Sequence, residues 1–245
     1  MMYTSALRRA LRLIPAMAVA LALAACDVAP AHLASPPPLG ARDTASRSGT
    51  GFAAVVARMK PVSEQICRER TPQLDCTFIV VVDDRAGQPP NAFHTRDAQG
   101  RPLIGFTTAM IREANDEELA LIFGHEAAHY LAGHQARMRE SATTGALVGG
   151  LLASLSGADQ ATAQRLANIG AGVGARSYSK DFELEADRLG TVIAWRAGFD
   201  PLVGAQFFRR SPDPGNQFLG THPPNPDRLQ LIARTVANLE AGLPI

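Results

Sequence analysis

The sequence predicts an α+β domain, mainly helical with a small β-sheet, and three observations support this fold class. Apolar residues recur at three- and four-residue steps over 52–62 and over 119–131, which is helical spacing. A β-branched and aromatic run over 76–82 indicates a buried strand. The chain has 245 residues, 46% of them apolar, which is enough for one domain of ordinary size with a hydrophobic core.

The composition divides the chain into three segments. Residues 1–25 predict a lipoprotein signal peptide, because three arginines precede an apolar stretch that is short for a permanent membrane helix. Residues 26–51 are rich in Ala, Pro, Ser and Gly and are expected to form a flexible tether. Residues 52–245 are the expected folded domain.

The end of the apolar stretch predicts how the chain is anchored. Leu23-Ala24-Ala25-Cys26 resembles a bacterial lipobox, so Cys26 is expected to carry lipid and to attach the chain to a membrane. An ordinary cleavage site followed by a chance cysteine is the alternative. The lipobox predicts a lipid-anchored protein of the bacterial cell envelope that faces the periplasm, and it leaves the inner and outer membranes both open.

Within the domain, the expected order is a helix, a small sheet and then further helices. Strands are expected over 76–82, 91–95 and 103–107, and helices over 52–62, 115–139, 159–170, 180–197 and 226–239. Residues 143–155 are apolar and rich in glycine. We expect a tightly packed helix or a loosely ordered flap there rather than a membrane helix, because the segment is short and glycines interrupt it.

Charge and cysteine content limit the function. The net charge of +1, without a long Lys/Arg run, predicts no nucleic-acid partner. Cys67 and Cys76 are expected to form a disulfide outside the cytoplasm, worth about 2–3 kcal/mol, with two free thiols as the alternative. The three cysteines are too few and too scattered for a cysteine-ligated zinc site.

His125-Glu126-Ala127-Ala128-His129 is the strongest chemical signal in the chain. Histidines four apart on a helix share one face and can ligate one zinc ion, while Glu126 lies close enough to act as a general base toward water. A surface helix with two solvated histidines is the alternative. The apolar residues on both sides disfavour it, because buried imidazoles need a compensating partner.

A third zinc ligand is expected from the downstream segment that starts at Glu183. Glu183 and Asp187 lie four apart on a predicted helix, so Glu183 can ligate the metal while Asp187 accepts the free N–H of a ligating histidine. A solvated acidic helix face is the alternative. Glu185 is rotated away, toward the surface. His134 is expected to be structural or exposed, since five residues on a continuous helix turn it by about 140° from His129.

Several segments together resemble a known family. They are Asn91-Ala92-Phe93, residues 103–107, the HExxH helix with His134, residues 182–190, residues 198–201, and Thr221-His222-Pro223-Pro224 with Arg228. They resemble the zincin-type gluzincin peptidases of family M forty-eight, which includes HtpX, the CAAX prenyl endopeptidase, Oma-type proteases, BepA and small lipoproteins such as LoiP. The resemblance implies that Glu183 is the third ligand, that His222 approaches the metal or substrate, and that Arg228 supports the site.

These features predict a zinc-dependent endopeptidase with one Zn²⁺ per chain that cleaves unfolded or misassembled polypeptides. The substrate is expected to lie extended along an edge strand, for which Leu103–Thr107 is the candidate. Two alternatives remain: a non-catalytic chaperone or adaptor that uses the same cleft, and a structural lipoprotein whose zinc only stabilises the fold. The oligomeric state stays open.

Overall fold

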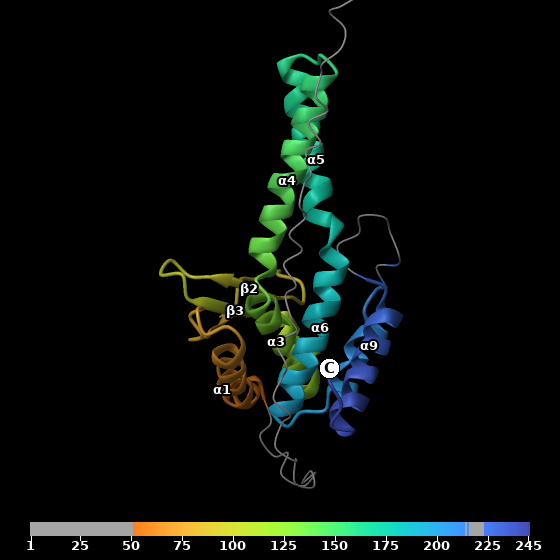
Figure 1. Cartoon of the computed structure of the whole chain (residues 1–245). Coiled ribbons are helices and arrows are strands. Elements are labelled where there is room, and N and C mark those ends of the chain that lie inside the picture. The colour runs from red at the N-terminus through yellow and green to blue at the C-terminus, as the bar shows by residue number, and fades with distance from the viewer. Residues whose placement is uncertain (1–50, 214, 216–222) are drawn as a thin grey trace, which may run out of the picture. The chain divides into compact units, whose positions relative to one another are not determined.

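A computed structural model describes residues 51–213, 215 and 223–245, and confirms the mainly helical α+β prediction (Figure 1). The elements, in chain order, are α1 Phe52–Arg70, β1 Ile79–Asp83, β2 Ala92–Arg96, β3 Pro102–Thr107, α2 Thr108–Glu113, α3 Asp116–Leu131, α4 His134–Leu155, α5 Gln160–Ser177, α6 Ser179–Arg196, α7 Pro201–Gly204, α8 Gln206–Arg210 and α9 Asn225–Glu240.

The three strands form one sheet in the order β1-β3-β2. β1 pairs with β3 in parallel and β2 pairs with β3 antiparallel, so β3 is the central strand. The expectation that Leu103–Thr107 is an edge strand is therefore wrong. Its almost continuous burial has a physical reason, because a central strand is paired along both edges. The edge strand beside α3 is β2 instead.

The main core joins α1, the sheet, α3 and α6. Phe78, Phe106 and Phe123 are each at most 1% exposed and belong to this single cluster. Cys67, near the end of α1, forms a disulfide with Cys76, just before β1. The bond fixes the turn that leads from the first helix into the sheet.

The start of α3 is stabilised by a capping box and by a buried ion pair. Asn115 accepts a hydrogen bond from the backbone N–H of Glu118, while the Glu118 carboxylate accepts one from the backbone N–H of Asn115. The Glu118 side chain is almost completely buried and is also bound by the guanidinium of Arg210 from α8. A buried carboxylate with these partners fixes the direction in which α3 enters the core.

The helix that carries His125 and His129 ends earlier than expected. α3 stops at Leu131, and Gly133 adopts a left-handed conformation with φ 65° before α4 starts at His134. Glycine takes this conformation without the steric cost that a side chain adds. Residues 143–155 are the second part of the continuous helix α4, which packs along α5, so the packed-helix expectation for this segment is correct. None of the described helices is both long and apolar enough to cross a membrane.

Candidate active site

Helices α3 and α6 cross at two glycines, and this close crossing brings the side chains of the site together. A Cβ atom added to Gly124 of α3 would lie 2.5 Å from the carbonyl oxygen of Gly190 of α6, and one added to Gly190 would lie 2.6 Å from the backbone nitrogen of His125. The two backbones can therefore approach this closely only without side chains at the crossing. Glu183 lies about two turns before Gly190, which brings its carboxylate to the histidines of α3.

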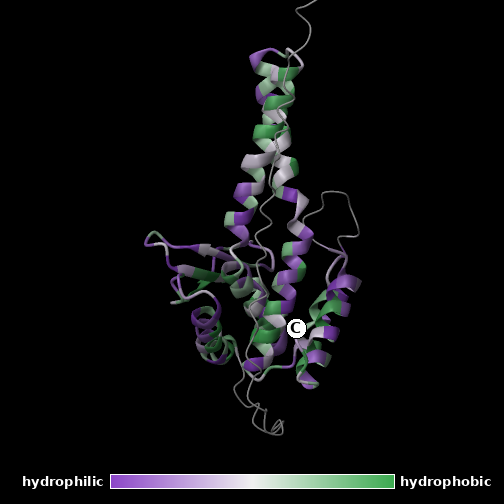
Figure 2. Cartoon of the chain, in the orientation of Figure 1, coloured by the Kyte–Doolittle hydropathy of each residue, from purple (hydrophilic) through white to green (hydrophobic). Residues whose placement is uncertain are grey.

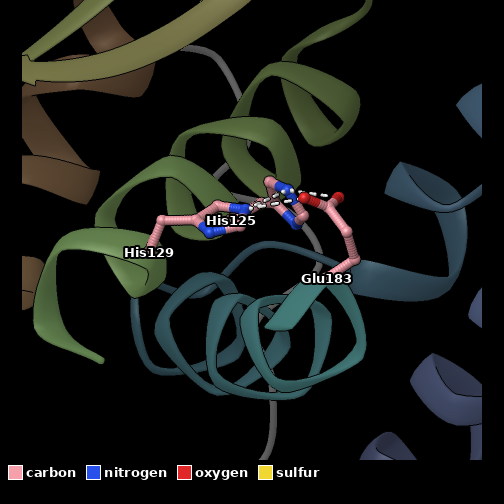
Figure 3. A group of neighbouring side chains, drawn as sticks. All are labelled: His125, His129 and Glu183. Carbon is pink, nitrogen blue, oxygen red and sulfur yellow. Dashed lines mark hydrogen bonds and ion pairs between the residues drawn. The ribbon is translucent and has the colours of Figure 1, made fainter. Parts of the chain in front are cut away.

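Three donor atoms converge between these helices (Figure 3). His125 Nε2 and His129 Nε2 lie 3.0 Å apart. Glu183 Oε2 lies 3.4 Å from His125 Nε2, and Glu183 Oε1 lies 3.3 Å from His129 Nε2. Donors at 2.0–2.1 Å from a tetrahedral zinc ion are separated by about 3.3 Å, which is close to the separation of the two histidines and of each histidine from one Glu183 oxygen. Among the residues that the structure describes, this donor group has three members, the number typical of a catalytic zinc site.

The electrostatics of the triangle also favour a cation. Burial lowers the pKa of His125, but hydrogen bonds with the carboxylates of Asp187 and Glu183 outweigh burial and raise that pKa to about 10. The negative potential that would hold a proton here would equally hold a divalent metal ion. The nitrogen, nitrogen and oxygen donors are those that zinc accepts.

Asp187 and Arg228 hold the far side of the His125 ring. His125 Nδ1 lies 2.9 Å from Asp187 Oδ1, and Asp187 accepts two further hydrogen bonds, of 2.7 and 2.6 Å, from Arg228 of α9. Burial raises the pKa of Asp187, but the hydrogen bonds and charge of Arg228 outweigh it and leave the pKa below its usual value. Asp187 is therefore ionised, accepts the Nδ1–H of His125, and directs Nε2 toward the donor triangle.

His134 orients the ring of His129 in the same way. Its Nδ1 lies 2.8 Å from His129 Nδ1, and its Nε2 lies 3.2 Å from Glu185 Oε2. A consistent proton arrangement has His129 Nδ1–H donating to His134, and His134 Nε2–H donating to Glu185. Arg137 donates a 2.8 Å hydrogen bond to the same Glu185 oxygen.

The expected orientation of His134 is wrong, and Glu185 makes a contact that was not expected. His134 is buried, 1% exposed, and faces the ligand pair because the turn at Gly133 breaks the helix on which the 140° rotation was counted. Glu185 is partly exposed, as expected, but its carboxylate belongs to the hydrogen-bonded chain that starts at His129.

Glu126 lies beside the donor triangle and is held by a residue of the sheet. His94 of β2 places Nδ1 3.0 Å from Glu126 Oε2, and its ring stacks on that of His129 at 5.1 Å. Burial raises the pKa of Glu126. The hydrogen bond from His94 and the nearby imidazoles outweigh burial, so the pKa lies below its usual value. Glu126 is thus a carboxylate able to accept a proton. His94 directly follows the Asn91-Ala92-Phe93 segment, but no local pattern singled it out.

A cleft of about 470 Å³ opens over these groups. Its wall includes β2 and the segment before it, the HExxH helix, Glu183, and Arg228 with two phenylalanines of α8. The lining residues include Asn91, Ala92, Phe93, His94, His125, Glu126, His129, Glu183, Phe207, Phe208 and Arg228. His222 and Cys26 lie outside the described residues.

A helical domain with a small sheet, an HExxH helix and a His-His-Glu donor triangle defines a metallopeptidase. The chain belongs to peptidase family M48, whose sequence model matches residues 56–236.

Three relatives illustrate the similarity. The mitochondrial metalloendopeptidase OMA1 of Saccharomyces cerevisiae is 30% identical over 64% of this chain and 46% of its own length. A beta-barrel assembly-enhancing protease of Yersinia pestis is 31% identical over 51% of this chain and 28% of its own length. The metalloprotease YcaL of Escherichia coli is 31% identical over 51% of both chains. The chain thus spans about half or less of these relatives. No solved structure gives a significant match.

Proposed function

We propose that the chain is a zinc-dependent endopeptidase that cleaves unfolded or misassembled proteins of the bacterial cell envelope. The observation that carries the proposal is the triangle of His125, His129 and Glu183, in which the histidines lie 3.0 Å apart, each lies 3.3–3.4 Å from one Glu183 oxygen, and Glu126 is next to it. When bound there, Zn²⁺ would activate a water molecule and polarise the scissile carbonyl group.

The side chains around the triangle then have distinct roles. Glu126 accepts the proton of the attacking water and returns it to the leaving amine. His94 holds Glu126 in place through their 3.0 Å hydrogen bond. Asp187 and Arg228 orient His125. A role for His222 in stabilising the negative charge that develops on the carbonyl oxygen rests on the family resemblance.

The cleft suits an extended polypeptide. β2 borders it, and in the described part of the chain β2 is hydrogen-bonded to β3 along one edge only. A substrate segment added to the other edge would be recognised mainly through its backbone. Such recognition favours chains that are unfolded or locally loosened, because their extended segments are not already hydrogen-bonded within a fold.

The envelope location is supported by the predicted signal peptide, the tether and the lipid anchor at Cys26. One relative is named for enhancing β-barrel assembly, which agrees with an envelope substrate. The lipid anchor would keep the protease at the membrane surface, where proteins in transit are still unfolded.

The test compares wild type with Glu126→Gln for zinc content and for cleavage of unfolded casein. We expect both proteins to bind one zinc and only wild type to cleave, with rates differing by at least about a hundredfold. Glu113→Gln makes the same chemical change at an exposed site and should cleave as wild type. Equal cleavage by Glu126→Gln would overturn the assigned base. Zinc binding without cleavage in wild type would favour the chaperone alternative.

A further inference from the structure

Helices α4 and α5 form an antiparallel hairpin that extends beyond the sheet and the site (Figure 1). Glycines let the two helices pack closely. A Cβ atom at Gly145 would lie 2.0 Å from the carbonyl oxygen of Gly170, and one at Gly149 would lie 2.2 Å from that of Leu166. The small residues lie at the contact between the two helices, and the large apolar side chains face outward.

The hairpin exposes more large apolar side chains than any other part of the described structure. Figure 2 shows hydrophobic residues, in green, along both of its helices. On α4 they are Met138, which is 39% exposed, and Leu147, Val148, Leu151, Leu152 and Leu155, which are 52–76% exposed. On α5 they are Leu166, Ile169 and Val173, which are 37–60% exposed. Members of both sets line a groove of about 640 Å³ between the helices. An apolar surface of this extent marks a binding site rather than an ordinary solvated face.

The chemistry of this surface is that of a lipid partner. No charged residue occurs between Glu140 and Asp159, and Arg165 is the one charged residue between Asp159 and Arg176. Beyond Met138, the large exposed apolar side chains of the two helices are all aliphatic. Protein interfaces are instead enriched in aromatic residues and arginine and are surrounded by a polar rim. Tyr178, 55% exposed, lines the groove at the end near α6, as an aromatic residue does at the headgroup level of a bilayer.

We infer that the aliphatic face of the α4–α5 hairpin lies in the interfacial layer of a phospholipid bilayer. The inference rests on the proposed lipid anchor. A lipid anchor at Cys26 would hold the domain at a membrane surface and so raise the local concentration of lipid around the hairpin.

The hairpin lies along the surface rather than crossing it. Asp159 caps α5 at the turn of the hairpin, and its hydrogen bonds with Thr162 lower the pKa of its carboxyl. A charged turn stays among the headgroups, because the hydrocarbon core disfavours it. No described helix is long and apolar enough to span a membrane.

The test uses residues 27–245, the predicted mature chain without Cys26, which carries neither the apolar signal segment nor an acylated cysteine. Its binding to vesicles of phosphatidylethanolamine and phosphatidylglycerol, three to one, is measured by co-sedimentation. The same chain with Leu151→Ser and Leu155→Ser should bind at least about tenfold more weakly. The matched control replaces Leu202 and Leu243, which are 42% and 57% exposed elsewhere, and should bind as before. Casein cleavage without vesicles, measured on every sample, tests the proposed protease activity separately.

Hydrogen exchange of residues 141–175 distinguishes a bilayer from the other possible occupants of the aliphatic face, a second copy or a segment of the same chain. We expect protection of the hairpin to appear only when vesicles are added. Vesicle binding that is equal in the hairpin and control variants would overturn the inference. It would also be overturned by protection without vesicles, whether in a dimer detected by sedimentation velocity, which indicates a second copy, or in a monomer, which indicates a segment of the same chain.

Discussion

The backbone nitrogen of His125 faces Gly190 across the α3–α6 crossing at a distance that leaves no room for a side chain. A Cβ atom at position 190 would lie 2.6 Å from that nitrogen. The position of a zinc-ligand candidate on one helix is thus set by a glycine on another helix. The geometry of the donor triangle follows from this contact and not from the HExxH helix alone.

Gly190→Ala is therefore expected to destabilise the fold and weaken zinc binding. The added methyl group pushes α6 from α3, at a cost of about 1–3 kcal/mol in the free energy of unfolding. Denaturant unfolding and a zinc-chelator competition measure the two effects. Gly172→Ala is the control, since nothing lies within 4 Å of a Cβ there, and it should stabilise α5 by about 0.5–1 kcal/mol. Equal unfolding curves for Gly190→Ala and wild type would contradict the crossing argument.

His134 is expected to set the zinc affinity of His129 without touching the metal. His134→Leu removes the acceptor of the His129 Nδ1–H, so zinc affinity should fall by about 10–100-fold. His134→Asn places an amide oxygen near the former Nδ1 and should restore most of the affinity. Competition with a chromophoric chelator measures both values. Unchanged affinity in a folded His134→Leu protein would show that the contact has no effect on the metal site.

Arg228→Met is expected to destabilise the protein strongly. Asp187, 2% exposed, would lose both guanidinium hydrogen bonds and keep only His125 as a partner, and removing one member of a buried ion pair costs about 3–5 kcal/mol. Thermal and denaturant unfolding of the metal-free protein measure this cost. Arg234→Met, an exposed position on the same helix, should change stability by less than about 0.5 kcal/mol. Similar losses in the two variants would refute the role of the Arg228–Asp187 pair.

Glu185 gives the stability of the metal-free protein a dependence on acid pH. Its hydrogen bond with His134, together with that from Arg137, lowers its pKa from 4.5 to about 2 in the folded state. Its contribution is therefore complete above the unfolded value of about 4.5 and disappears as the pH falls toward 2. The carboxylate is 40% exposed, so the contribution is below about 1 kcal/mol. The difference in unfolding free energy between wild type and Glu185→Gln should shrink between pH 6 and pH 3. A difference that does not change with pH would rule out this linkage.

Some of the site was predictable because its signals are local. Two histidines four apart on a helix and two carboxylates four apart on another specify shared faces before any fold is known. The structure brings His125, His129, Glu183 and Asp187 together accordingly. Arg228 reached the prediction only through family resemblance, since its contact with Asp187 joins positions 41 apart in the chain.

The unpredicted parts depend on long-range geometry. His94 meets Glu126 across 32 positions because β2 forms the edge of the sheet beside α3, and strand order does not follow from strand spacing. For the same reason, strand spacing does not show that β3 is the central strand. The orientation of His134 depends on the turn at Gly133, which separates α4 from the helix that ends at Leu131.

The most direct test of the central claim is the X-ray absorption spectrum of zinc bound to wild-type protein, together with the zinc content of Glu183→Ala. We expect one zinc per wild-type chain, coordinated by two imidazole nitrogens and by oxygen at about 2.0–2.1 Å, and almost none bound to Glu183→Ala. Glu113→Ala should keep its zinc. A full zinc complement in Glu183→Ala, or a wild-type spectrum without two imidazoles, would contradict the assignment of the metal centre.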